Sequence, residues 1–206
     1  STVVANLAVA MAQAGFSVVV IDADMRRPAQ QEAFNLSNER GLSTLLARSD
    51  VEWNSVARAN ADLKLRVITS GPIPPNPGDL LKSPRFNALL ETLSDEFDMV
   101  IIDTPPALAV SDALVVADVA KDVLLVSRAN ETRVDRLQAA VGALPETARV
   151  IGIALNYQKR GRAESYYYYY GNSDSSGGSA PPSQNGSGQN FGEKIRQLVP
   201  GGASKA

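Results

Sequence analysis

The stretch FSVVVIDADMRRP, residues 16–28, decides the fold. Its first seven residues end at Asp22 and form a short, continuous apolar run rich in β-branched side chains. Such a run is typical of a parallel strand that is buried on both faces. Similar runs predict strands at 99–103, 122–127 and 150–156, and a weaker run predicts a strand at 65–69.

Helix-length segments lie between these runs. From Ser1 to Ala14 the apolar residues recur at helical spacing, and Gly15 is placed to end that helix. The other clear helical segments are 83–97 and 131–144. Because strands and helices alternate along the chain, we predict an α/β domain with a doubly wound, mostly parallel sheet.

The composition limits the chemistry that the chain can perform. Its 206 residues contain no His and no Cys. This excludes a Ser-His-Asp triad, a thiolate nucleophile, a Cys/His zinc site and disulfides. A metal would have to be a hard cation held by oxygen ligands, for which magnesium is the obvious candidate. The formal net charge of −2 predicts no nucleic-acid partner.

The composition also divides the chain. Residues 171–190 are rich in Gly, Ser, Asn, Gln and Pro, which predicts a flexible tail. We expect one domain over 1–164, a tyrosine cluster at 165–170 and a tail over 171–206 with a short helix at 191–199. No apolar run reaches the roughly 20 residues that span a bilayer, and no signal peptide opens the chain, so we expect this piece to be soluble and cytosolic.

Two of the predicted strands end in aspartate, at Asp22 and Asp103. Ligands of open parallel sheets bind at the carboxyl ends of the strands, so both carboxylates should enter one crevice. The pair suggests a magnesium site. The alternative is that each is an ordinary turn or cap residue.

The segments VVVIDADMRRP (18–28) and MVIIDTPP (99–106) resemble the second and third nucleotide motifs of the deviant-Walker P-loop ATPases. The phosphate loop of that group ends in Gly-Lys-Ser/Thr-Thr and opens a helix. This chain begins STVVANLA without an initiating Met, so we expect a fragment cut just after the lysine, lacking the first strand and the phosphate loop. Such a fragment should fold poorly alone and bind ATP weakly. The resemblance implies that Ser1 ligates magnesium and that Thr2 lies beside the α-phosphate, whereas without it the pair is an ordinary helix cap.

Three further segments resemble the bacterial tyrosine kinases of exopolysaccharide and capsule assembly. They are RGLSTLL (40–46), GPIPPNPGDLLKSPRF (71–86) and GIALN (152–156). The proline-dense segment is otherwise a rigid loop leading into a helix. In this superfamily the Asn that ends the last segment, here Asn156, faces the adenine.

A run of five tyrosines precedes the tail. They are Tyr166, Tyr167, Tyr168, Tyr169 and Tyr170. Five adjacent rings cannot all enter a core, and a regular strand would expose half of them. The run resembles the C-terminal phosphoacceptor cluster of bacterial tyrosine kinases; the alternative is a sticky or stacking aromatic patch.

The resemblance implies an ATP-dependent protein-tyrosine autokinase that uses ATP and Mg2+. Ser1, Asp24 and Asp103 would hold magnesium, directly or through water, and Asp22 would deprotonate the tyrosine. Which of Asp22 and Asp24 is the base stays open. Arg26 and Arg27 would stabilise phosphate charge or form a surface pair.

The resemblance also implies partners and a location. We expect a ring-like homo-oligomer that phosphorylates in trans, and a transmembrane chain-length regulator, fused upstream or separate, that activates the kinase. The kinase would then work at the cytoplasmic face of the bacterial inner membrane.

Other members of the superfamily give the alternatives. The runner-up is a partitioning or cell-division type ATPase switch without kinase activity. A degenerate interaction module that does not turn over ATP stays open, whereas an iron–sulfur scaffold ATPase is excluded by the absence of Cys.

Overall fold

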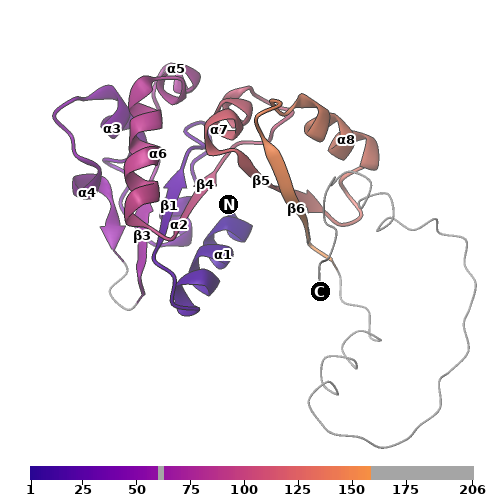
Figure 1. Cartoon of the computed structure of the whole chain (residues 1–206), viewed down its shortest axis with the longest axis horizontal. Coiled ribbons are helices and arrows are strands. Elements are labelled where there is room, and N and C mark those ends of the chain that lie inside the picture. The colour runs from indigo at the N-terminus through magenta and orange to yellow at the C-terminus, as the bar shows by residue number, and fades with distance from the viewer. Residues whose placement is uncertain (60–62, 159–206) are drawn as a thin grey trace, which may run out of the picture.

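The computed structural model describes residues 1–59 and 63–158 (Figure 1). The tyrosine cluster 165–170, the tail 171–206 and the helix expected at 191–199 lie outside the described residues. The division into a domain, a cluster and a tail therefore stays a prediction.

The first sheet contains three of the predicted strands. These are β1 (Val18–Asp22), β3 (Leu65–Ile68) and β4 (Met99–Asp103). All three are parallel, with β1 in the middle, which confirms the parallel character expected from the sequence. A two-residue strand that the sequence did not predict, β2 (Arg58–Ala59), pairs antiparallel with β3 at the edge.

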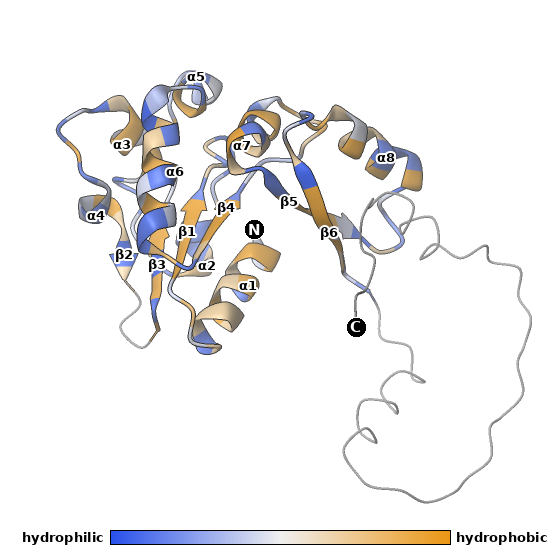
Figure 2. Cartoon of the chain, in the orientation of Figure 1, coloured by the Kyte–Doolittle hydropathy of each residue, from blue (hydrophilic) through white to orange (hydrophobic). Residues whose placement is uncertain are grey.

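Alternate side chains of β1 enter two different cores, because successive side chains of a strand point to opposite faces. Val18 and Val20 pack with Ala8 and Ala12 of α1 (Thr2–Gln13). Val19 and Ile21 face a larger cluster formed with the helices on the other side of the sheet. These helices are α3 (Leu42–Ala47), α4 (Trp53–Val56), α5 (Pro77–Leu81), α6 (Pro84–Glu96) and α7 (Asp112–Ala120). Burial on both faces explains why β1 is apolar from Val18 to Ile21 (Figure 2).

The remaining strands form a second, two-stranded parallel sheet. It contains β5 (Asp122–Arg128) and β6 (Arg149–Asn156), connected by α8 (Val134–Ala143). Within the described residues β4 and β5 are not hydrogen-bonded to each other, so the sheet is in two parts. Figure 1 shows β5, β6 and α8 at the opposite end of the molecule from α3 and α4.

The helix predicted over 131–144 is shorter than expected. A turn precedes α8, in which Thr132 N donates to Arg128 O (2.9 Å) and Arg128 N donates to Thr132 Oγ1 (2.9 Å). These bonds satisfy the local backbone without a helix. In the part of the chain that the structure describes, none of the helices is both long and apolar enough to cross a bilayer.

Candidate active site

The two strand-ending aspartates lie side by side. Asp22 and Asp103 are register partners at the carboxyl ends of β1 and β4. Both are buried, with 0% and 4% of their surface exposed. The strand spacing of about 4.8 Å therefore places the two carboxylates at one point of the sheet edge, as the sequence predicted.

The carboxylate of Asp22 is held by the turn that follows β1. Its Oδ2 accepts hydrogen bonds from Ala29 N (3.0 Å) and Gln30 N (2.9 Å), and its Oδ1 accepts one from Asp24 N (3.2 Å). Burial raises the pKa of Asp22 from 3.8 to about 6, with the nearby Asp103 charge adding to the rise and the backbone donors opposing it. A carboxylate with a pKa of about 6 is suited to accept a proton near neutral pH.

Asp24 closes the same turn. Its Oδ1 accepts hydrogen bonds from Arg26 N (3.2 Å) and Arg27 N (2.9 Å). The residue is 9% exposed, more than Asp22. Two carboxylates of one motif therefore lie in different environments, with Asp22 buried more deeply.

The start of α1 meets this edge of the sheet. The amino nitrogen of Ser1 lies 3.5 Å from Asp103 Oδ1, and Thr2 is the first residue of α1. The Ser1 side chain makes no capping hydrogen bond to this helix. The first N–H groups of a helix attract anions, so the start of α1 places such groups beside the carboxylates.

Sequence reasoning missed Gln30, the first residue of α2 (Gln30–Ala33). Its side chain is fully buried, and Nε2 donates to Asp103 Oδ2 (2.7 Å) and to Ser1 O (3.2 Å). Gln30 thus connects β4 to the start of α1. Gln30 belongs to none of the motifs that the sequence offered, so the sequence held no signal for it.

Sequence reasoning also missed Asp112, at the start of α7. The guanidinium of Arg26 donates to Asp112 through Nε (2.7 Å) and NH2 (3.2 Å). The Asp112 side chain is 2% exposed and that of Arg26 is 46% exposed. The pair fixes the turn after β1 to α7, so the structure gives Arg26 a positioning contact beside its predicted role toward phosphate.

Asn156 lies at the carboxyl end of β6, in the second sheet. Its Oδ1 accepts a hydrogen bond from Tyr157 N (2.9 Å), and the Arg128 guanidinium lies 4.8 Å from the centroid of the Tyr157 ring. In the described residues none of the hydrogen bonds of Asn156 reaches the carboxylate cluster. Its predicted contact with adenine stays a prediction.

The carboxylate oxygens of this cluster are of the kind that coordinate magnesium when a phosphate also binds the ion. Within 1–59 and 63–158, no group of three or more acidic side chains is arranged to hold a metal ion by itself. Magnesium is usually bound through one or two carboxylates, with substrate phosphates and waters completing the shell. Asp103 and Asp24 are carboxylates of the kind that bind magnesium, and the start of α1 lies where a phosphate could complete the shell.

Comparison with known proteins shows the family of the chain. The family model described as AAA domain matches residues 1–138. The chain is 42% identical over 168 residues to the tyrosine-protein kinase YwqD of Bacillus subtilis, covering 81% of this chain and 70% of that protein. It is 38% identical over 163 residues to the putative tyrosine-protein kinase CapB of Staphylococcus aureus, covering 79% and 71%.

A solved structure agrees with these relatives. The kinase domain of the Escherichia coli tyrosine kinase ETK is 39% identical, with a TM-score of 0.72 over 77% of this chain and 62% of that one. These relatives are kinases, which favours a kinase over the partitioning-type ATPase that is the runner-up. The chain therefore belongs to the AAA-domain family and, within it, to the bacterial tyrosine kinases.

Proposed function

We propose that this chain is the catalytic domain of an ATP-dependent autokinase that phosphorylates its own tyrosine cluster, Tyr166–Tyr170. The observation that carries the proposal is the buried pair Asp22–Asp103 at the sheet edge, beside the start of α1. The pair supplies a base and a magnesium-binding carboxylate next to a phosphate-binding helix end.

In this mechanism Asp22 is the general base. The tyrosine oxygen attacks the γ-phosphorus, the bond from that phosphorus to the bridging oxygen of ADP breaks, and the phenolic proton passes to the Asp22 carboxylate. The pKa of about 6 supports the choice of Asp22, since its carboxyl is ionised at pH 7 yet basic enough to take the proton.

Ser1, Asp24 and Asp103 would hold magnesium, which neutralises charge on the phosphates when it is bound. Thr2 would contact the α-phosphate, Arg27 the transferred phosphate and Asn156 the adenine. Arg26 would reach phosphate only with the N–H groups that Asp112 leaves to it, because its Nε and NH2 already donate to that carboxylate.

The biological setting follows from the same family. The kinase would assemble as a ring of subunits that phosphorylate one another, and a transmembrane chain-length regulator would activate it at the inner membrane. Each phosphate adds about −1.5 to −2 charges, so several adjacent phosphotyrosines would repel and loosen the ring. This cycle would regulate the synthesis and export of exopolysaccharide or capsule.

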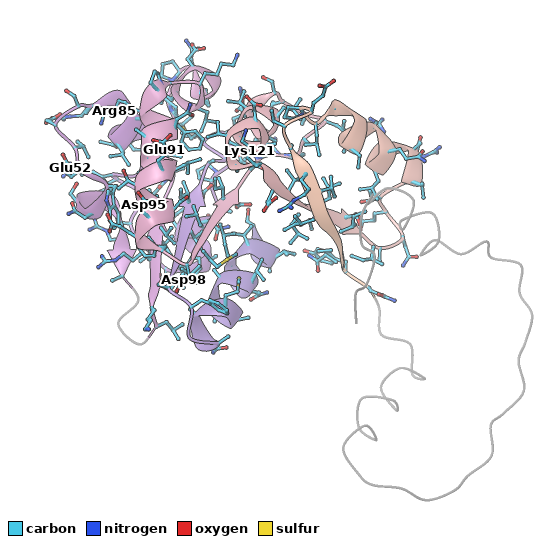
Figure 3. All side chains as sticks on the ribbon, in the orientation of Figure 1. Glu52, Arg85, Glu91, Asp95, Asp98 and Lys121 are labelled. Atoms are coloured by element: carbon cyan, nitrogen blue, oxygen red, sulfur yellow. The ribbon has the colours of Figure 1, made fainter. Side chains whose placement is uncertain are left out.

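The test uses the natural full-length protein incubated with Mg-ATP. Mass spectrometry should locate phosphate on Tyr166–Tyr170, and Asp22→Asn should lower the rate by about 10²- to 10⁴-fold, because general-base catalysis is lost. Asp95→Asn is the matched control, because Asp95 is an exposed carboxylate on α6 (Figure 3). Phosphate elsewhere, or an equal rate with Asp22→Asn, contradicts the proposal. ATP hydrolysis without phosphotyrosine favours the partitioning-type switch.

A further inference from the structure

Gln30 touches each of the elements that form the carboxylate site. Its backbone N–H donates to Asp22 Oδ2 (2.9 Å), and its side-chain Nε2 donates to Asp103 Oδ2 (2.7 Å) and Ser1 O (3.2 Å). The residue has 0% of its surface exposed. One buried side chain therefore fixes the end of β4 relative to Ser1, the residue that precedes α1.

The orientation of the Gln30 amide is set by its neighbours. The Asp103 carboxylate and the Ser1 carbonyl are both acceptors, so the amide nitrogen has to face them. The amide oxygen Oε1 is then buried without a hydrogen-bond partner. An unsatisfied buried acceptor costs about 1–3 kcal/mol, so a hydrogen-bond donor beside Oε1 would be favourable.

The position of Gln30 Oε1 indicates which group could donate a hydrogen bond to it. Oε1 shares its carbon with Nε2, which contacts the two residues, Ser1 and Asp103, that are assigned to magnesium. Magnesium keeps several waters when it binds through one or two carboxylates. A water on the ion is an O–H donor at this place.

We propose that Gln30 is a positioning residue of the magnesium–nucleotide site: it orients the Asp103 carboxylate through Nε2 and accepts a hydrogen bond from a magnesium-bound water at Oε1. The inference rests on the proposed function and deepens it. Partners of metal ligands in other sites act in this way, and their loss costs about 10- to 100-fold in metal affinity or activity.

The neighbouring Gln31 provides a matched control. It is the same residue type on the same short helix, and its Oε1 is also buried without a partner. Its Nε2 donates to Pro28 O (3.2 Å), which is a bond within the local turn. Gln31 is only partly buried as a residue, but it shares the buried, unpaired oxygen and lacks the contacts with Asp103 and Ser1.

The experiment measures magnesium dependence without turnover. Binding of a fluorescent ATP analogue to the natural full-length protein is titrated with Mg2+ for wild type, Gln30→Met and Gln31→Met. Methionine has a similar volume but lacks the donor and the acceptor. We expect Gln30→Met to raise the Mg2+ concentration at half-saturation by about 10-fold or more, and Gln31→Met to change it by less than about 2-fold.

Two further measurements separate a positioning role from a structural one. Nucleotide affinity in EDTA should be the same in wild type and Gln30→Met, because the hydrogen bond that we propose for Oε1 forms only when the ion is bound. If Gln30→Met does not fold, Gln30→Asn serves instead, since it keeps the amide but is too short to reach Asp103.

An unchanged Mg2+ half-saturation in Gln30→Met, or an equal change in Gln31→Met, overturns the inference. Loss of affinity in EDTA as well as with Mg2+ also overturns it, because the residue is then a structural support of α2. In any of these outcomes the effect of Asp22→Asn on phosphotyrosine still tests the proposed function separately.

Discussion

The β1–β4 region and the β5–β6 region contain similar strand sequences in different environments. Every residue of β1 is buried, because β3 and β4 flank it and helices cover both of its faces. In the β5–β6 pair, Val126 is 50% exposed and Ile151 is 56% exposed. A continuous apolar run predicts a parallel strand, but the neighbours of that strand decide how much water it loses.

The same difference decides the chemistry of the aspartates. Asp22 ends a buried strand, and desolvation raises its pKa. Asp122 begins β5 at the surface, where its side chain is 49% exposed and paired with Arg149. The carboxylate of the packed region therefore has a raised pKa, whereas the carboxylate of the open region forms a surface ion pair of small energetic value.

Substituting one isoleucine in each region tests this comparison most strongly. Ile21→Ala should lower the free energy of unfolding by about 2–5 kcal/mol, because it opens a cavity in the larger core. Ile151→Ala should lower it by less than about 1 kcal/mol, since that side chain is more than half exposed. Urea denaturation measures both. Equal losses would show that β6 is as well packed as β1.

Two glycine substitutions should change the free energy of unfolding by smaller amounts and in opposite directions. A Cβ on Gly41 would clash with Thr69 O and Gly71 N, where the start of α3 is bonded to the end of β3. We expect Gly41→Ala to lower the free energy of unfolding by about 1–3 kcal/mol. Gly142→Ala, in open space on α8, should raise it by about 0.5–1 kcal/mol through helix propensity. Thermal melting of both variants checks the pair, and destabilisation by both would contradict it.

The pH dependence of kcat/KM tests the difference between the aspartates of the two regions. Protonated Asp22 cannot accept the phenolic proton, so kcat/KM should fall about tenfold per pH unit below a limb near pH 6. Asp122→Asn should leave that limb in place, since Asp122 belongs to the open region. A limb near pH 4, the ordinary carboxyl range, would contradict the assignment.

The raised pKa also has a consequence for stability. Folded Asp22 binds its proton more tightly than unfolded Asp22, so its contribution favours the folded state at low pH and is lost as the pH rises from about 4 to about 6. Denaturation midpoints measured across that range should show the loss in wild type. They should show less of it in Asp22→Asn.

The sequence determined the parallel strands and the placement of Asp22 and Asp103, because strand periodicity and the order of β–α units are local properties. It also placed β4 without error at 99–103, since that run is bounded clearly on both sides. The motif DADMRRP predicted site roles for Asp22 and Asp24 by resemblance to a family.

Only the tertiary structure decided the rest. The contacts of Gln30 with Asp103 and of Arg26 with Asp112 join residues 73 and 86 positions apart, and no local pattern encodes them. The pKa of Asp22 likewise depends on how completely other elements remove water from its carboxylate. The periodicity of strands and helices can be seen in the local sequence, whereas desolvation and long-range pairing arise only when the elements pack together.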